Sequence, residues 1–406
     1  MSALTSGSLR PLSTDPALMS EPIPYRRLSG FYFFYFALLG SIVPYWPLYL
    51  KSLEFDARTI GMLMAIVQGS RIIAPNIWGW AADRSGRRIE IVRFGSGMTA
   101  LVFLAIFWQD SAAGIAWVML GFSFFWNAVL PQFEVIALRH LGAQRARYSL
   151  LRLWGSVGFV LAVVVLGWVL DIIGVQGLPW VMAFLMLMIW GNSLLVNAPA
   201  SEARDRRRGD SFLRTLRHPQ VMAFYGIVFL VQFGHGPYYT FYSLLLESLG
   251  YSRGQIGLLW ALGVIAEILV FTVMHHLIGR FGIRTLMLAS LWLCVLRWLL
   301  IAWLPEHLFW MLVAQVLHAA TFGCLHVLGI SLVQHYFAER SQGQGQALFS
   351  SFGFGAGGAG GALVAGLLWD TQGSAVAFMA AAAASAVAIM LAFIWIRPEK
   401  LQQNER

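Results

Sequence analysis

Residues 79–88 read Gly79-Trp80-Ala81-Ala82-Asp83-Arg84-Ser85-Gly86-Arg87-Arg88, a short basic turn between two long apolar stretches. Gly86 permits a tight turn between two helices. Asp83 can cap the following helix or pair with an arginine across an interface, and the arginines hold the turn at anionic lipid headgroups. The turn therefore indicates two membrane-spanning helices that are joined on the cytoplasmic side.

Apolar stretches of about 20 residues recur on both sides of this turn. Of the 406 residues, 58% are hydrophobic and 12% are charged, whereas roughly 25% are charged in an average soluble protein. The mean hydropathy is +0.68. About 20 apolar residues in a helix cross the ~30 Å hydrocarbon core of a bilayer. We expect an all-α integral membrane protein with spans at 28–50, 58–82, 91–109, 113–138, 149–172, 178–197, 220–246, 254–279, 284–304, 307–335, 345–369 and 374–396.

The distribution of Lys and Arg predicts the orientation of these twelve helices. With both termini placed in the cytoplasm, 22 of the 28 basic residues lie on the cytoplasmic side and 3 on the other side, and the remaining 3 lie within spans. Basic residues are enriched in cytoplasmic loops. The net charge of +9 therefore reflects topology and anionic headgroups, and it gives no support to nucleic-acid binding.

The longest polar stretch inside the chain divides the spans into two groups of six. It contains Arg204-Asp205-Arg206-Arg207-Arg208, and such a run of like charge is typical of a solvated linker. Internally duplicated transporters have two such halves, and Gly279 to Arg284 keeps the glycine and arginine spacing of the first basic turn. The expected parts are a disordered cytoplasmic tail (1–27), an N-terminal half (28–197), a linker (198–219), a C-terminal half (220–397) and a second tail (398–406).

Five charged residues fall inside the expected spans: Arg71, Glu134, Arg152, Glu267 and Arg297. A charge at the centre of a bilayer costs roughly 2.5–3.5 kcal/mol even on lenient insertion scales, and such residues commonly line a solute or ion pathway. The three arginines against two acids leave a formal charge of +1, which favours an anionic solute. Arg71 lies ~18 Å along its helix from Asp83, and its guanidinium suits a carboxylate. The alternative is a contact between Arg71 and a helix carbonyl.

The spacing of the other four charges predicts one acid–arginine pair in each half. Glu134 and Arg152 are each nine residues from the centre of their turn, near 143, and Glu267 and Arg297 are each fifteen residues from a turn near 282. Antiparallel helices thus place each acid and its arginine at the same depth. A pair of this kind can also serve only to lock two helices together, because a paired buried charge costs much less than a lone one.

The basic turn resembles the signature loop of the major facilitator superfamily at every defined position, namely Gly79, Asp83, Arg84, Gly86, Arg87 and Arg88. The order of Glu134, Arg152, Glu267, Arg297 and His318 is similar to that in the oligosaccharide–proton symporters, which include lactose permease. That resemblance implies solute binding by Glu134 and Arg152 and proton coupling by Glu267, Arg297 and His318. Two positions depart from the pattern: Thr321 replaces a proton-carrying glutamate, and Phe159 replaces the tryptophan that stacks on a sugar.

The sequence resembles the 3-phenylpropionate permease branch of the superfamily more closely, from the first span to the tenth. The matching segments include Pro44-Tyr45-Trp46, Arg152-Leu153-Trp154-Gly155, Gly234-His235, Tyr238-Tyr239, Ala266-Glu267, Arg297-Trp298 and Leu317-His318. Trp46, Trp154, Tyr238 and Tyr239 are candidates for the lining of a ring-accepting cavity, and His235 is a candidate for the coupling network. Most tryptophans in such a protein belong to the interfacial belt or the core, and a lone histidine in an apolar helix is commonly a packing residue.

These observations predict a monomeric proton symporter in the bacterial inner membrane that moves a small aromatic or apolar monocarboxylate by alternating access. The coupling ion is a proton, and we expect no other cofactor and no metal, since Cys294 and Cys324 lie in apolar segments without ligand spacing around them. A sugar or nucleoside is the alternative solute. An integral membrane enzyme or a sensor is the alternative class; the first lacks a cluster of catalytic residues in the loops, and the second lacks an additional soluble domain.

Overall fold

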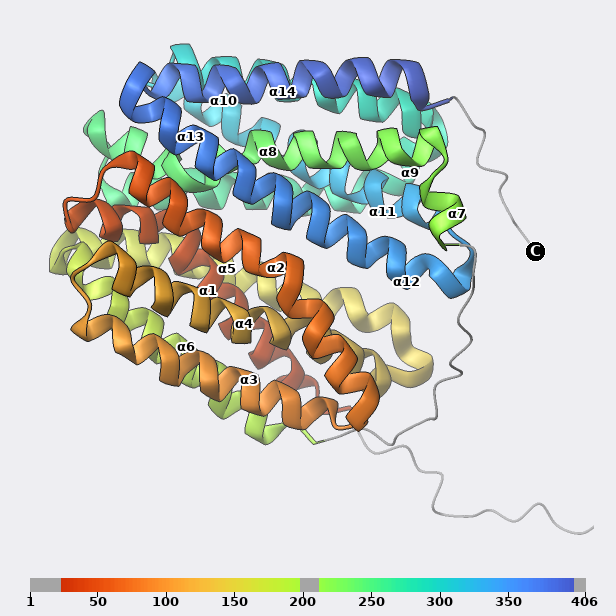
Figure 1. Ribbon diagram of the computed structural model, residues 1–406, viewed down its shortest axis with the longest axis horizontal. Coiled ribbons are helices and arrows are strands. Elements are labelled where there is room, and N and C mark those ends of the chain that lie inside the picture. Colours follow the sequence, from red (N-terminus) through yellow and green to blue (C-terminus); the bar gives the residue numbers. More distant parts are fainter. Residues whose placement is uncertain (1–22, 198–211, 398–406) are drawn as a thin grey trace, which may run out of the picture.

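The computed structural model describes residues 23–197 and 212–397, and every regular element in them is a helix. Figure 1 shows the helices running side by side along one direction, with those of the first half of the chain on one side and those of the second half on the other. The first set comprises α1 (Tyr25–Ser52), α2 (Ala57–Ser85), α3 (Arg88–Phe103), η2 (Leu104–Trp108), α4 (Ala112–Leu141), η3 (Gly142–Arg147), α5 (Tyr148–Ile173), η4 (Val175–Gly177) and α6 (Leu178–Leu195).

The second set begins with a short helix and contains two π-helical segments, η5 and η6. It comprises α7 (Phe212–Leu216), α8 (Pro219–Ser248), α9 (Arg253–Trp303), α10 (Leu308–His318), η5 (Ala319–Cys324), α11 (Leu325–Tyr336), α12 (Glu339–Leu348), η6 (Phe349–Gly357), α13 (Gly358–Gln372) and α14 (Ser374–Trp395). We call α1–α6 the N-terminal set and α8–α14 the C-terminal set.

Ten helices in the described residues are long and apolar enough to cross a membrane. The 51-residue α9 covers the two spans expected at 254–279 and 284–304, and its backbone leaves the helical conformation at Gly282, where φ is 76° and ψ is 159°. The 30-residue α8 coincides with the span expected at 220–246, but it is not among these ten. The protein is therefore an all-helical, multi-pass membrane protein.

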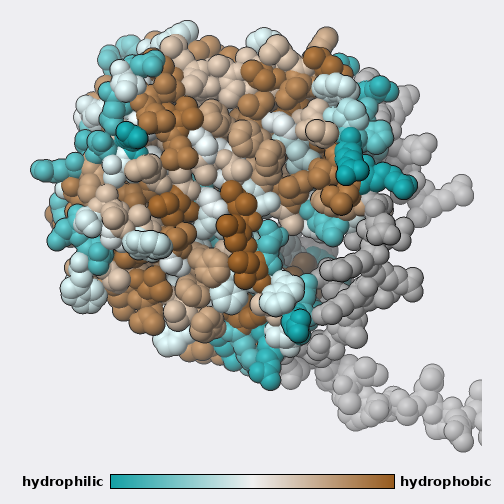
Figure 2. Space-filling model, viewed as in Figure 1, coloured by the Kyte–Doolittle hydropathy of each residue, from teal (hydrophilic) through white to brown (hydrophobic). Residues whose placement is uncertain are grey.

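Large apolar side chains cover much of the outside of the helices, as the brown areas of Figure 2 show. Ile172, Trp108 and Trp117 are 84%, 76% and 73% exposed. A soluble protein rarely exposes contiguous apolar surface on this scale, whereas lipid-facing helices do. Inside, the buried apolar side chains form two clusters, one mainly in the N-terminal set and one mainly in the C-terminal set.

Two segment boundaries differ from those expected. The helix α1 begins at Tyr25, inside the segment expected to be a disordered tail, and α7 lies inside the expected linker. The rest of the expected tails and linker, 1–22, 198–211 and 398–406, lies outside the described residues.

The helices alternate in direction, so the molecule has two ends. We call the end with the α1–α2 turn the Asp56 end, and the end with the α2–α3 turn the Gly86 end; the first is on the left of Figure 1. Gly86 ends α2 with φ of 70°, the left-handed conformation that glycine adopts without strain. The tight turn expected at this glycine is therefore confirmed.

Candidate functional site

Glu134 of α4 and Arg152 of α5 face each other, with 3.8 Å between Oε1 of the acid and Nε of the arginine. This confirms the pair predicted from their equal distances to the α4–α5 turn. Their side chains remain 36% and 38% exposed, although both belong to membrane-spanning helices. Arg152 also lies within electrostatic reach of Glu267 and His326 of the C-terminal set. The pair therefore borders solvent-accessible space between the two sets, which we call the cavity.

Rings of α1 hold Arg152 from its other side. The guanidinium carbon lies 4.1 Å from the ring centroid of Phe36 and 5.8 Å from that of Tyr32, within the range of cation–π contacts. The hydroxyl of Tyr32 donates to that of Tyr148 at 3.5 Å, and Tyr148 is also hydrogen-bonded to Glu134. Tyr148 precedes Arg152 by one helical turn and lies on the same face of α5. This spacing is the signal in the sequence that points to Tyr148.

Arg71 lies near the middle of α2, where this helix meets η6 of the C-terminal set. A Cβ on Gly355 would lie 3.3 Å from the backbone nitrogen of Ile72, so the two helices touch at this level. Arg71 is half-buried and, among the described residues, makes no hydrogen bond or ion pair. Tyr35 of α1 and Tyr239 of α8 lie within electrostatic reach of it. Arg71 thus presents a guanidinium to the space between the two sets.

Glu267 of α9 contacts a histidine and not the expected arginine. Its Oε2 lies 3.7 Å from Nε2 of His318 at the end of α10. The carboxylate also lies within electrostatic reach of Arg152 in the other set. The side chain is 14% exposed, so Glu267 borders the same cavity from the opposite side.

The predicted pairing of Glu267 with Arg297 is wrong. Arg297 is fully buried, and it donates from Nε to the carbonyl of Ala314 at 2.9 Å and from Nη1 to Oγ1 of Thr321 at 3.1 Å. Its guanidinium carbon also lies 4.2 Å from the ring centroid of Tyr238. Glu267 and Arg297 were expected at the same depth, but equal depth does not determine the direction in which each side chain points from its helix.

Aromatic residues of α8 and α9 form the wall of the C-terminal set beside Glu267 and His318. The hydroxyl of Tyr238 donates to Oε1 of Gln315 at 2.8 Å, and its ring centroid lies 4.5 Å from that of Trp260. The ring of Tyr239 lies nearly parallel to that of Trp260 at 6.3 Å. Tyr239 is half-buried, whereas Tyr238 is buried, so Tyr239 is the better placed of the two to touch a solute.

His235 packs inside the C-terminal set. Its Nδ1 lies 2.8 Å from the carbonyl of Val231, and its ring lies edge-on to Trp298 with 5.0 Å between centroids. It is fully buried, and its Nε2 has no partner among the described residues. The structure therefore places it behind the cavity wall and not in direct reach of a solute.

Three other residues expected at the site lie elsewhere. Trp46 is fully buried in the N-terminal set, where its indole nitrogen donates to Sδ of Met119 at 3.4 Å. Trp154 donates to the hydroxyl of Tyr25 at 3.3 Å, on a different face of α5 from Arg152. Phe159 is buried and packs in the cluster of the C-terminal set. These rings fill the interior or the outer surface and do not surround the Glu134–Arg152 pair.

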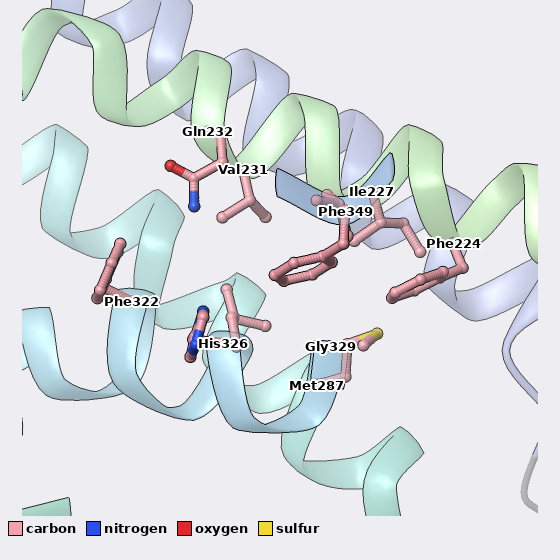
Figure 3. A pocket seen from close by; sticks show the side chains of 11 residues that line it. Phe224, Ile227, Val231, Gln232, Met287, Phe322, His326, Gly329 and Phe349 are labelled. Atoms are coloured by element: carbon pink, nitrogen blue, oxygen red, sulfur yellow. The ribbon is translucent and has the colours of Figure 1, made fainter. Parts of the chain in front are cut away.

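Figure 3 shows a narrow pocket within the C-terminal set, with His326 and Gln232 at its polar end. Its other walls are mostly apolar and include Phe224, Val231 and Phe349. The ring of Phe322 stacks between those of His318 and His326, with interplanar angles of 12° and 8°. The pocket thus lies next to the Glu267–His318 contact but contains no charged residue that would hold an anion.

The basic turn at the Gly86 end is held by contacts within it. Arg88 donates to a carboxylate oxygen of Asp83 and to Oε1 of Gln132 in α4. Nη1 of Arg87 lies 3.6 Å from Oε2 of Glu90, and the guanidinium of Arg84 lies over the ring of Trp80. A Cβ on Gly79 would lie 3.9 Å from Nε2 of the same Gln132. The turn therefore ties α2 to α4 at this end.

Comparison with known proteins gives the same class of protein. A model described as "MFS_1 like family" matches residues 25–380. The chain is 30% identical over 369 residues to the probable 3-phenylpropionic acid transporter of Escherichia coli (strain K12), across 86% of this chain and 93% of that relative. It is 25% identical over 395 residues to the maltose permease of Geobacillus stearothermophilus, across 93% and 95% of the two chains.

Solved structures of transporters share the fold. A mutant of the nucleoside transporter NupG superposes with a TM-score of 0.82 and 18% identity, covering 92% of this chain and 100% of that one. The POT family transporter PepTSo superposes with a TM-score of 0.71 and 12% identity, covering 92% and 97%. At these identities the two structures establish the arrangement of the helices and leave the solute open.

Proposed function

The chain belongs to the MFS_1 like family and is a secondary transporter of the major facilitator type, not an enzyme, and we propose that it takes up an aromatic or apolar monocarboxylate together with a proton. We further propose that it does so as a monomer of twelve spans in two halves of six, 28–197 and 220–397, by alternating access. The break in α9 at Gly282 and the length of α8 support twelve spans, since they add two to the ten apolar helices.

The environment of the Arg71 guanidinium is the basis for proposing an anionic solute. Of the three intramembrane arginines, Arg152 has a carboxylate partner and Arg297 has two hydrogen-bond acceptors, whereas Arg71 has neither among the described residues. An unpaired guanidinium inside a membrane is costly, and a carboxylate fits its planar pair of donors. A bound monocarboxylate would neutralise it. This one observation carries the proposal.

The aromatic body of the solute is proposed from the rings around Arg71. Tyr35 packs against Trp126 with 5.1 Å between ring centroids, and Tyr239 packs against Trp260. Aromatic pairs prefer offset or edge-on arrangements at 4.5–7 Å, so a ring entering this space would find suitable neighbours. The relative from Escherichia coli, named a probable 3-phenylpropionic acid transporter, supports the same class of solute.

Proton coupling is proposed for Glu267. It is the intramembrane acid that lacks an arginine within ion-pair distance, and its Oε2 faces the imidazole of His318 at 3.7 Å. Thr321 stands at the position where the oligosaccharide–proton symporters have a proton-carrying glutamate. It accepts a hydrogen bond from Arg297. A proton on Glu267 and a carboxylate at Arg71 would enter the cavity from the same side and leave it on the other.

The proposed orientation places both termini and the Gly86 end in the cytoplasm of a bacterial inner membrane. The asymmetry of 22 basic residues against 3 supports it. A topology reporter fused after Glu306, which lies at the Asp56 end, is expected to report the periplasm. A cytoplasmic signal at this position would reverse the orientation.

The sugar or nucleoside alternative makes an opposite prediction about charge. The maltose permease relative supports it, and Glu134 with Arg152 offers polar groups for hydroxyls. A neutral solute, however, would leave Arg71 without a partner. The discriminating measurement is therefore whether a bound solute must carry a carboxylate.

Binding to the purified protein tests this directly. We expect 3-phenylpropionate to raise the melting temperature and 3-phenylpropanamide, its neutral counterpart, to leave it unchanged. Arg71→Gln is expected to weaken binding of the acid at least tenfold, because a hydrogen-bonded charge pair contributes about 1.5–3 kcal/mol. Arg58→Gln, on the same helix but exposed, is the control and is expected to bind normally. Equal binding of acid and amide, or of Arg71→Gln and the parent protein, would refute an anionic site at Arg71.

A further inference from the structure

A carboxylate of the C-terminal set caps a helix of the N-terminal set at the Asp56 end. Asp370, in the last turn of α13, accepts a hydrogen bond from the backbone nitrogen of Ala57 at 3.2 Å and another from that of Arg58 at 2.9 Å. These are the first two residues of α2. The third, Thr59, donates at 2.8 Å to Asp56, the helix's own N-cap.

The same arrangement occurs a second time with the two sets exchanged. Asp171, in the last turn of α5, accepts hydrogen bonds from the backbone nitrogens of Arg253 and Gly254, both at 3.0 Å. These are the first two residues of α9. The third, Gln255, donates at 3.2 Å to the N-cap Ser252. Each helix start is thus capped partly by its own set and partly by the other.

The sequence carries the same repeat on both sides of these contacts. Each aspartate is followed three residues later by a glycine with positive φ, which is 79° at Gly174 and 90° at Gly373. Each capped helix contains Ile-Gly at equal distance from its N-cap, Ile60-Gly61 and Ile256-Gly257. The two capping contacts are therefore equivalent parts of a duplicated structure.

Electrostatics favours a carboxylate at both places. The first N–H groups of a helix have no acceptor within the helix, and the helix dipole places partial positive charge there. A carboxylate that takes two of these N–H groups satisfies both with charge-assisted hydrogen bonds. Because carboxylate and N–H groups are in different sets, the bonds last only while the sets are in contact at this end.

The backbones around the two caps are in close contact. A Cβ on Gly61 would lie 2.7 Å from the carbonyl oxygen of Ala362, and one on Gly257 would collide with the carbonyl oxygen of Val163. Arg253 also donates from Nη1 to the carbonyl of Leu170 at 2.9 Å. The Asp56 end is therefore closed, while the Glu134–Arg152 pair, nearer the Gly86 end, keeps about a third of its side-chain surface exposed.

We propose that Asp171 and Asp370 are the gate residues of the Asp56 end, and that their contacts with the starts of α9 and α2 hold this end closed. The inference rests on the proposed alternating access, but not on the solute or the proton. Both aspartates are already exposed, so when the sets separate at this end the four N–H groups exchange a carboxylate acceptor for water.

Distances between spin labels at the Asp56 end test the gate. One label replaces the exposed Gln176 of η4, and the other replaces the exposed Glu306, in the loop before α10, so that each set carries one label away from the caps. The buried Cys294 and Cys324 are changed to serine.

The variants are Asp171→Asn, Asp370→Asn and both together. Asparagine has nearly the size of aspartate, but it has no charge and only one acceptor oxygen. Asp110→Asn, an exposed acid at the same end, is the control.

We expect one short distance in the parent protein and in Asp110→Asn. Each single variant should add a population at longer distance, and the double variant should make that population the larger one. Asp171→Glu and Asp370→Glu, which retain the carboxylate, should restore much of the short distance. Unchanged distance distributions in both single variants, or an equal change in Asp110→Asn, would overturn the proposal. No solute or pH gradient is used, so this outcome is independent of the proposed substrate.

Discussion

The three intramembrane arginines have three different environments, although each interrupts an apolar helix. Arg152 lies between Glu134 and the rings of α1. Arg297 donates from Nε and Nη1 to two acceptors and lies against the faces of Tyr238 and Trp298, while its Nη2 has no partner in the described part of the chain. Arg71 borders the cavity without such a partner in the described part of the chain. A buried charge therefore marks a functional region, but its partners decide whether it serves binding or packing.

This difference predicts opposite effects for two substitutions. Glu134→Gln should change the melting temperature little, because an exposed ion pair contributes about 0–1 kcal/mol, and it should weaken solute binding at least tenfold. Arg297→Met should lower the melting temperature by several degrees, because each buried acceptor left unsatisfied costs about 1–3 kcal/mol. Thermal unfolding and solute titration of the purified variants measure both effects. If Glu134→Gln unfolds early and the folded fraction still binds, the Glu134–Arg152 pair is structural.

Residue spacing was sufficient to predict one of the two acid–arginine pairs. The turn between α4 and α5 is short, and Glu134 and Arg152 are close to it. Two residues at equal depth on these helices are therefore also close neighbours. Glu267 and Arg297 are farther from their turn, and their helices carry them toward different neighbours. The contacts of Asp171 and Asp370 join residues about 80 and 310 positions apart in the chain, a relation that no local pattern in the sequence contains.

At the level of helices, the apolar stretches placed most ends within a few residues of those observed. Caps explain this agreement, for example Asp56 at the start of α2 and Gly86 at its end. The π-helical segments were not predictable, because an apolar run has the same composition in an α-helix and a π-helix. The segment η5 places Thr321 beside Arg297, and a Cβ on Gly323 would lie 3.0 Å from Cγ of Glu267. Such segments are frequent at functional sites.

Close packing of α13 on α8 predicts unequal effects at two adjacent glycines. A Cβ on Gly361 would collide with the carbonyl oxygen of Phe233, whereas one on Gly360 would lie 3.5 Å from the nearest atom of that residue's ring. Gly361→Ala should therefore lower the melting temperature clearly. Gly360→Ala should leave it unchanged or raise it slightly, since alanine favours a helix over glycine by about 0.5–1 kcal/mol. Equal effects of the two changes would mean that the two helices do not pack this closely.

At the scale of the whole molecule, the two sets of helices meet closely at one end and leave the charged cavity accessible nearer the other. Figure 1 shows the sets on opposite sides of the molecule, and the described contacts between Asp370 and α2 and between Asp171 and α9 join them at the Asp56 end. Arg71 and Glu134 with Arg152 come from one set, and Glu267 with His318 from the other. A solute bound between the sets would therefore contact both and respond to their relative motion.

Uptake into proteoliposomes under an imposed pH gradient, alkaline inside, tests the proposed symport most directly. Protein-free liposomes measure the passive accumulation of the weak acid, and Arg71→Gln controls for the carboxylate site. We expect 3-phenylpropionate to accumulate at an initial rate well above that of both controls, and Glu267→Gln to retain exchange of external for internal solute while losing gradient-driven accumulation. Accumulation no faster than in protein-free liposomes would contradict the proposed transport of an aromatic monocarboxylate, and gradient-driven accumulation by Glu267→Gln would contradict the proton-coupling role of Glu267.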